Sequence, residues 1–410
     1  MARLWHGAMV VGLLAGCGGA VAGGGVAGAG SGVAGAGSGV AGAGSGVAGA
    51  GPNLQTAPGW SPASSAAASA LDAGVAAAEL KGGALVVVAT ADWCEPCNEL
   101  HHRFLDTPAG QTALASHVLR EFDVDTSTGN AVAAQLRVLG YPTTLVLRRH
   151  DGQLVEMGRV EGFDSAAEYQ HTLQELLAKT TAIGWCAEPL PAALPASTEP
   201  QVVLPVLRCA AASLRSPTAD GAALVLTAFV DDPARWAAAA QWPETARVEV
   251  LGAVRLLGRY QTRVRGEHLL CAQTFGAMLA FAGTPDQGKP GYHYWRAKCL
   301  LRGGQPDAAR HQLEGLLRDK ANAVGTAELV ADFVVHEALK QPWGPAWAQA
   351  LLNAVLAQKP DNHWAHYLLG TLHTKAGRVQ LAKDELALAL KLKADSAIYA
   401  RHLAQLQLIR

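Results

Sequence analysis

Two cysteines separated by two residues give the strongest chemical signal in this sequence, in the segment Trp93-Cys94-Glu95-Pro96-Cys97. The segment follows a Val-rich run that is typical of a buried strand, and a helix is expected to begin at Glu95. A thiol at a helix N-terminus faces unpaired backbone N–H groups and the positive end of the helix dipole, which favour the thiolate. The spacing keeps the second sulfur within one turn, where it can resolve a mixed disulfide. We therefore expect Cys94 to attack and Cys97 to resolve.

An alternating pattern of strands and helices surrounds this pair and must position it. Strands are expected at residues 84–90, 117–124, 143–149 and 154–160, and helices at 95–105, after Pro108, at 130–136 and from an Asp164 cap to about Lys179. The order strand, helix, strand, helix, hairpin, helix predicts an α/β domain over residues 63–183, with a mixed sheet flanked by helices.

A second motif, Gly140-Tyr141-Pro142-Thr143, opens the third of these strands. Together with the cysteine pair it resembles the thioredoxin superfamily, in which a cis-proline loop lies against the redox cysteines. The resemblance covers the 63–183 domain and implies that Trp93, Tyr141 and Pro142 face the substrate. The stretch Ala91-Asp92-Trp93-Cys94, together with the later Phe104-Leu-Asp-Thr-Pro108, resembles thioredoxin-like reductase modules of the cell envelope more than the cytosolic protein.

Two positions differ from the pattern of cytosolic thioredoxins, and a third affects the reduction potential of the cysteine pair. Val88 stands where cytosolic thioredoxins carry a buried aspartate, and Asn98 stands where they carry a lysine. Glu95 places a negative charge beside Cys94, which disfavours the thiolate and makes the couple more reducing. We therefore expect a reductant.

Other uses of the cysteine pair have weaker support. A zinc site needs four ligands, and His101 and His102 follow the pair without a second cysteine pair nearby; we interpret both as solvated helix surface. Haem attachment would need His at position 98. A purely structural disulfide remains open. We expect no metal and no cofactor.

The N-terminus resembles that of a bacterial lipoprotein. A short apolar run ends in Leu14-Ala15-Gly16-Cys17, too brief to span a bilayer. This predicts a signal peptide over residues 1–16 and lipid attachment at Cys17, and Gly18, in place of the aspartate linked to inner-membrane retention, favours the outer membrane. Residues 17–62 contain a repeated Val-Ala-Gly-Ala-Gly-Ser-Gly unit, which predicts a flexible tether.

The remaining cysteines have an even count once Cys17 carries lipid, because the chain has seven in all. Cys186, Cys209, Cys271 and Cys299 could form two structural disulfides, or could be small buried hydrophobic residues. A helical hairpin through Pro285 and Pro290 would bring Cys271 and Cys299 to similar heights, so we expect that pair to be bridged.

The C-terminal half reads as helical. A Pro/Ala-rich linker is expected at 184–200, followed by an all-α domain at 201–410. Gly370, Gly377 and Ala382 fall where tetratricopeptide repeats place small helix-crossing residues, and a weaker copy lies around Gly304. Ordinary helical packing is the alternative.

Composition excludes some functions. The formal net charge is −1 and no long Lys/Arg run is present, so nucleic acid is not an expected partner. We expect an extracytoplasmic, lipid-anchored thiol-disulfide oxidoreductase that reduces exported proteins and draws electrons from an unidentified donor. The alternative is an envelope scaffold whose helical repeats bind partners and whose thioredoxin fold is not catalytic.

Overall fold

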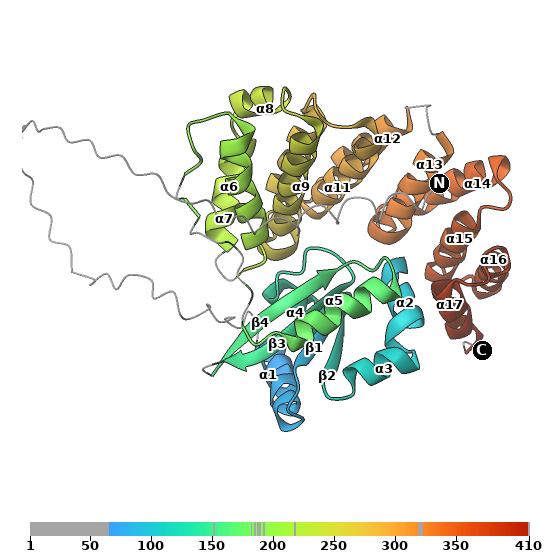
Figure 1. Ribbon diagram of the computed structural model, residues 1–410. Helices are drawn as coiled ribbons and strands as arrows, with labels where there is room; N and C mark the ends of the chain where they lie inside the picture. Colours follow the sequence, from blue (N-terminus) through green and yellow to red (C-terminus); the bar gives the residue numbers. More distant parts are fainter. Residues whose placement is uncertain are drawn as a thin grey trace, which may run out of the picture. The chain divides into compact units, whose positions relative to one another are not determined.

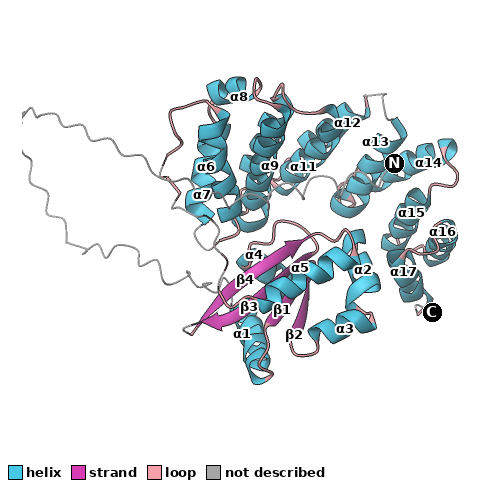
Figure 2. Ribbon diagram, viewed as in Figure 1, coloured by secondary structure: helices cyan, strands magenta, loops and turns pink. Residues whose placement is uncertain are grey.

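A computed structural model describes residues 65–408 of the protein, except 151, 182, 184–185, 187–189, 192, 217–218 and 319–322. The expected signal peptide at 1–16, the lipid site at Cys17 and the tether at 17–62 lie outside the described residues. Two regions follow one another along the described chain, here called the sheet domain (65–178) and the helical domain (200–407), within one compact unit (Figures 1 and 2).

The sheet domain contains a four-stranded mixed sheet in the order β2-β1-β3-β4. Its strands are β1 (Leu85–Thr90), β2 (Val118–Asp123), β3 (Thr143–His150) and β4 (Gln153–Glu161). β1 pairs in parallel with β2 and antiparallel with β3, and β3 and β4 form an antiparallel hairpin. The expected α/β domain with a mixed sheet is confirmed, as Figure 2 shows.

Helices cover both faces of this sheet. They are α1 (Ser65–Leu80), α2 (Glu95–Leu100) with the π-helical turn η2 (His101–Leu105), α3 (Pro108–Leu114), α4 (Ser127–Gln135) and α5 (Ala166–Ala178). Leu71 of α1 and Val132 of α4 join one cluster with Leu85 and Val87 of β1. Because strand side chains alternate, Val86 and Val88 point to the other face, where Tyr169 of α5 packs. Burial on both faces explains the unbroken Val-rich run of β1.

Two details differ from the sequence expectation. The cap of α5 is Ser165, whose Oγ accepts from the Glu168 N–H at 3.2 Å, and not Asp164. His101 is half-buried rather than solvated, because its Nε2 lies 2.8 Å from Glu121 Oε2. The hydrogen bond that His101 donates to the Glu121 carboxylate raises the pKa of His101 above 6.5, with burial opposing it.

The helical domain is a succession of helices. They are α6 (Pro200–Ser213), α7 (Ala219–Val230), α8 (Pro233–Ala239), α9 (Glu244–Tyr260), α10 (His268–Ala280), α11 (Lys289–Arg302), α12 (Pro306–Leu317), α13 (Ala323–Phe333), α14 (Gly344–Gln358), α15 (His363–Lys375), α16 (Val379–Leu392) and α17 (Ala397–Gln407). Short non-α turns are η3 (Gln261–Arg265), η4 (Asp286–Gly288) and η6 (Val334–Ala338). Among the described residues, no helix combines the length and apolar character needed to cross a membrane.

Small residues permit close helix pairing, as the repeat pattern predicts. A Cβ on Gly370 of α15 would lie 2.6 Å from Leu386 Cγ of α16, so only glycine allows this approach. Gly377 between these helices has φ +71°, and Gly304 between α11 and α12 has φ +76°. Both turns use the left-handed region that favours glycine. The weaker copy around Gly304 therefore has the same turn geometry as the stronger one.

Candidate functional site

The redox pair lies where β1 ends and α2 begins. Cys94 is the N-cap of α2, with Glu95 and Pro96 in the first turn. Cys94 and Cys97 form a disulfide with Cα atoms 5.2 Å apart. The Cys97 N–H donates to Cys94 Sγ at 3.2 Å, so a backbone donor already faces the sulfur that would carry the thiolate charge.

Both sulfurs are well covered. Cys94 is 5% exposed and Cys97 is 1% exposed, and both belong to the core cluster of α1, α4 and β1. Asn98 stabilises the loop between β1 and α2, because its Nδ2 donates to the carbonyls of Cys94 at 2.8 Å and Asp92 at 3.3 Å. The residue that replaces the usual lysine therefore has a structural role in this chain.

The structure brings the expected substrate-facing residues together. The Tyr141–Pro142 bond is cis. The rings of Trp93 and Tyr141 meet edge to face, with centroids 6.0 Å apart. Trp93 and Tyr141 also pack against the core that contains both cysteines, so these four residues form one cluster, here called the redox cluster. Cys17, the expected lipid site, lies outside the described residues.

Asp125 belongs to this cluster and the sequence reasoning missed it. Its Oδ2 accepts from Trp93 Nε1 at 2.8 Å. Burial and then the neighbouring charge of Asp123 raise the pKa of Asp125, while the hydrogen bond from Trp93 lowers it. The available signal was its position: β1 and β2 are parallel neighbours, so the residues after them lie at the same edge of the sheet. Val88, by contrast, is fully buried and apolar.

Cationic side chains of the helical domain also reach the cluster. Lys393 forms an ion pair with Glu95, and Arg401 forms one with Asp92. Lys298 lies over the ring of Trp93, and Arg263 lies over the ring of Tyr141. α17 packs against α2, consistent with their neighbouring positions in Figure 1. No local sequence signal indicated these partners, because they lie far away along the chain.

The other four cysteines are paired. Cys271 of α10 and Cys299 of α11 form a disulfide with Cα atoms 5.9 Å apart, which confirms the bridge expected from the helical hairpin. Cys186 forms a disulfide with Cys209 of α6, with Cα atoms 5.4 Å apart. The segment before α6 is thus tied covalently to the helical domain.

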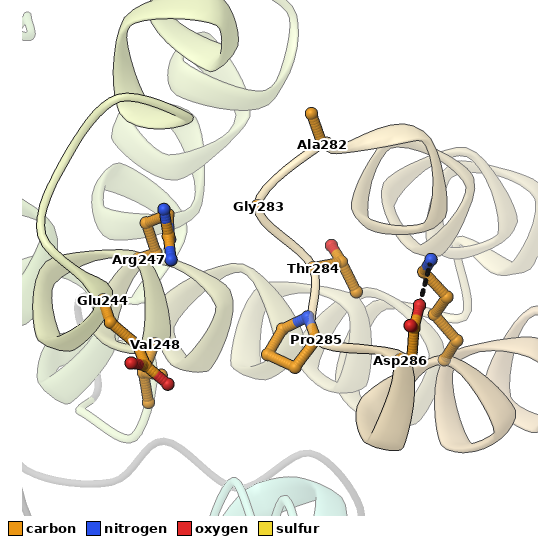
Figure 3. Close-up of a pocket in the computed structure, with 9 residues that line it drawn as sticks. Glu244, Arg247, Val248, Ala282, Gly283, Thr284, Pro285 and Asp286 are labelled. Carbon is orange, nitrogen blue, oxygen red and sulfur yellow. Dashed lines mark hydrogen bonds and ion pairs between the residues drawn. The ribbon is translucent and has the colours of Figure 1, made fainter.

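A separate hollow of about 430 Å³ lies between the start of α9 and the α10–α11 loop (Figure 3). Glu244 and Arg247 line one side, and Asp286 and Lys289 form an ion pair of 2.6 Å at the other. The hollow shares no residue with the redox cluster. Within the part of the chain that the structure describes, no group of three or more His, Cys, Asp or Glu side chains could hold a metal ion.

Comparisons with known proteins match two segments of the chain. Residues 66–148 match a family model described as thioredoxin-like, and residues 345–406 match one described as tetratricopeptide repeat. The thiol:disulfide interchange protein DsbD of Klebsiella pneumoniae is 35% identical over 102 residues, which is 24% of this chain and 17% of that protein. The protein of the same name from Escherichia coli K12 is 36% identical over 101 residues, 24% of this chain and 17% of that protein.

The chain therefore spans less than a fifth of the length of these curated relatives. A solution structure of a thioredoxin from Thermus thermophilus is 27% identical, with a TM-score of 0.25, and the match covers 26% of this chain and 83% of that one. The chain thus carries a thioredoxin-like domain with a Cys-x-x-Cys pair, followed by a largely helical region that includes a tetratricopeptide repeat.

Proposed function

We propose that the protein reduces disulfides of exported proteins through Cys94 and Cys97, while Cys17 anchors it by lipid to the cell envelope. The observation that carries this proposal is the Cys94–Cys97 disulfide at a strand-to-helix junction, in one cluster with Trp93 and with Tyr141 of the Gly140–Thr143 loop. Relatives of the thioredoxin-like segment are named thiol:disulfide interchange proteins, which supports the same reaction.

The reaction begins with the reduced pair. The Cys94 thiolate attacks one sulfur of the substrate disulfide, so that an S–S bond forms to Cys94 and the other substrate sulfur leaves as a thiolate that takes up a proton. Deprotonated Cys97 then attacks Cys94 Sγ, which restores the Cys94–Cys97 disulfide and releases the second substrate thiol. Two electrons pass from the pair to the substrate, and a dithiol donor must return them.

An extracytoplasmic location has separate support. The bridges Cys186–Cys209 and Cys271–Cys299 are of the kind that persists in oxidising compartments. The sequence ending at Cys17 favours lipid attachment, and Gly18 favours the outer membrane. Electrons would come from a donor in the envelope, and the helical domain would bind the substrate or another partner.

A trapping experiment tests the reaction. In Cys97→Ala the mixed disulfide cannot be resolved, so adducts that a reductant removes should accumulate on non-reducing gels. Cys94→Ala is the matched control and should give far fewer, because Cys97 is 1% exposed. If Cys97→Ala forms no adducts, and the wild-type chain supplied with a chemical reductant does not reduce insulin, the reaction is wrong.

The second candidate is an envelope scaffold in which the pair is a structural disulfide. The low exposure of Cys94 and the helical-domain cations against Trp93 and Tyr141 favour it. Failure of both assays, with binding of a partner retained in Cys94→Ala, would support this function instead.

A further inference from the structure

Acidic side chains surround Cys94 within the sheet domain. Asp92 precedes it by two residues, Glu95 follows it directly, and Asp125 accepts the hydrogen bond from Trp93. The sequence from Ala89 to His102 contains neither lysine nor arginine. By themselves these carboxylates disfavour a thiolate on Cys94, because like charges repel.

The helical domain pairs the two carboxylates that bracket Cys94. Lys393, the C-cap of α16, donates from Nζ to Glu95 Oε1, and its side chain is only 13% exposed. Arg401 of α17 places Nη2 3.2 Å from Asp92 Oδ1 and donates to the Asp92 carbonyl at 3.0 Å. Both neighbouring charges are thus countered by cations about 300 residues later in the chain.

The two aromatic side chains of the cluster also face helical-domain cations. Lys298 Nζ of α11 lies 5.9 Å from the ring centroid of Trp93, and Arg263 Cζ of η3 lies 4.3 Å from that of Tyr141. The Lys298 side chain is 6% exposed and pairs with Glu337. Burial lowers the pKa of Lys298 to about 8, with the charge of Glu337 opposing that fall.

We propose that the helical domain supplies the positive charge that stabilises the Cys94 thiolate, and that Lys393 is a positioning residue that cancels the charge of Glu95. This inference rests on the proposed redox function and adds which charges set the reduction potential of the Cys94–Cys97 pair. The acids of this neighbourhood are Asp92, Glu95, Asp123 and Asp125, and Glu337 of the helical domain faces Asp125. From the helical domain, Lys393 and Arg401 pair with Glu95 and Asp92, Lys298 and Arg263 face Trp93 and Tyr141, Arg302 shares Glu337 with Lys298, Lys375 faces Asp125, His402 faces Asp92 and Tyr399 faces Glu95.

The charge of Lys393 should have a definite effect on the redox couple. A stabilised thiolate favours the reduced pair, so the cations make the couple less reducing than Glu95 alone would make it. Removing the Lys393 charge should raise the pKa of Cys94 and make the couple more reducing. Removing the Glu95 charge should have the opposite effect, and removing both should return the pKa close to that of the parent chain.

The test uses full-length chain with Cys97→Ala, in which Cys94 has no disulfide partner. The rate of Cys94 alkylation by iodoacetamide is followed against pH, with the modified peptide identified by mass spectrometry. The Lys393–Glu95 ion pair is partly exposed to solvent, which weakens its effect. Lys393→Gln should therefore slow alkylation below the pKa of Cys94 by about threefold to tenfold, and Glu95→Gln should speed it by a similar factor. Lys391→Gln removes the same charge from an exposed position on α16 and should have little effect.

A second measurement uses chains that retain Cys97. Equilibration of the pair with glutathione should show Lys393→Gln more reducing than the parent, and a tenfold change in the equilibrium constant corresponds to about 30 mV. The inference is overturned if Lys393→Gln alkylates like Lys391→Gln, or if Lys393→Gln and Glu95→Gln shift the pKa in the same direction. Alkylation does not require turnover, so failure of the trapping assay would refute the function and leave this charge test intact.

Discussion

The ion pair between Glu161 and Arg215 joins the sheet domain to the helical domain and gives a quantitative prediction. Glu161 is the last residue of β4, and Arg215 follows α6. Arg215 Nε and Nη2 each donate to one carboxylate oxygen of Glu161 at 2.5 Å. The two side chains are 15% and 23% exposed for Arg215 and Glu161, respectively, so solvent screens the pair weakly.

The pKa of Glu161 measures how strongly the fold favours its charge. Burial alone would raise this pKa, but the charge and hydrogen bonds of Arg215 outweigh burial and lower it from 4.5 to about 2. At about 1.4 kcal/mol for each pKa unit, this corresponds to about 3 kcal/mol of stability. Because the folded pKa is depressed, the contribution is fully present above pH 4.5 and is lost as the pH falls towards 2.

Glu161→Gln keeps the size of the side chain and removes its charge, as protonation does. We expect the free energy of unfolding at pH 7 to fall by about 3 kcal/mol, measured by urea denaturation of the full chain with each transition fitted separately. The difference between parent and variant should shrink to about half at pH 3, where the unfolded carboxylate is already protonated.

The control is Glu249→Gln, which breaks the Arg208–Glu249 pair on the exposed side of α6 and α9. That pair should contribute no more than about 1 kcal/mol. The reasoning fails if Glu161→Gln lies within about 1 kcal/mol of the parent at pH 7, or if the difference is the same at pH 3 and pH 7.

Four further outcomes are expected. Cys17→Ala should move the protein from the membrane pellet to the soluble fraction, because stable anchoring needs acyl chains, and a variant that stays in the pellet would contradict the anchor. Pro142→Thr in a chain that keeps Cys97 should prolong the life of mixed disulfides on non-reducing gels, because the thioredoxin resemblance implies that this proline shapes the loop that faces the substrate. Glu121→Gln should lower the pKa of His101 in NMR titration, and an unchanged pKa would refute this. The raised pKa contributes stability that is fully present below pH 6.5 and is lost as the pH rises through the pKa of His101 in the folded state. Cys271→Ser opens a 28-residue disulfide loop and should cost about 2 to 4 kcal/mol in urea denaturation, whereas an unchanged midpoint would show that the bridge adds nothing.

Local signals were sufficient for the centre of the site. The Val-rich strand β1 is continuous because it is buried on both faces, and the cysteine pair follows it at the start of α2. Pro142 and the turn glycines Gly377 and Gly304 are positions where backbone geometry restricts the residue type. Each of these restrictions concerns the residue type at a single position, so a sequence can reveal it without knowledge of distant contacts.

Element ends and the first helix were less predictable. α1 consists largely of alanine, whose small side chain gives little contrast between a buried and an exposed face, and no separate helix was predicted there. The cap of α5 is Ser165 because its hydroxyl, and not the adjacent Asp164 carboxylate, reaches the Glu168 N–H. Asp164 and Ser165 are both suitable capping residues, and only the coordinates show which of their side chains reaches the free N–H group.

The electrostatic surroundings of Cys94 were decided by tertiary structure alone. From the sequence, Glu95 was an unpaired acid that makes the couple more reducing, and Lys393 and Arg401 were ordinary charges on C-terminal helices. Packing of α17 against α2 turns these cations into partners of the residues that bracket Cys94. Charged side chains at the ends of helices leave no periodic pattern, and their partners depend on how helices hundreds of residues apart are stacked. The sequence therefore specified the redox pair, whereas the charge around it follows from the fold.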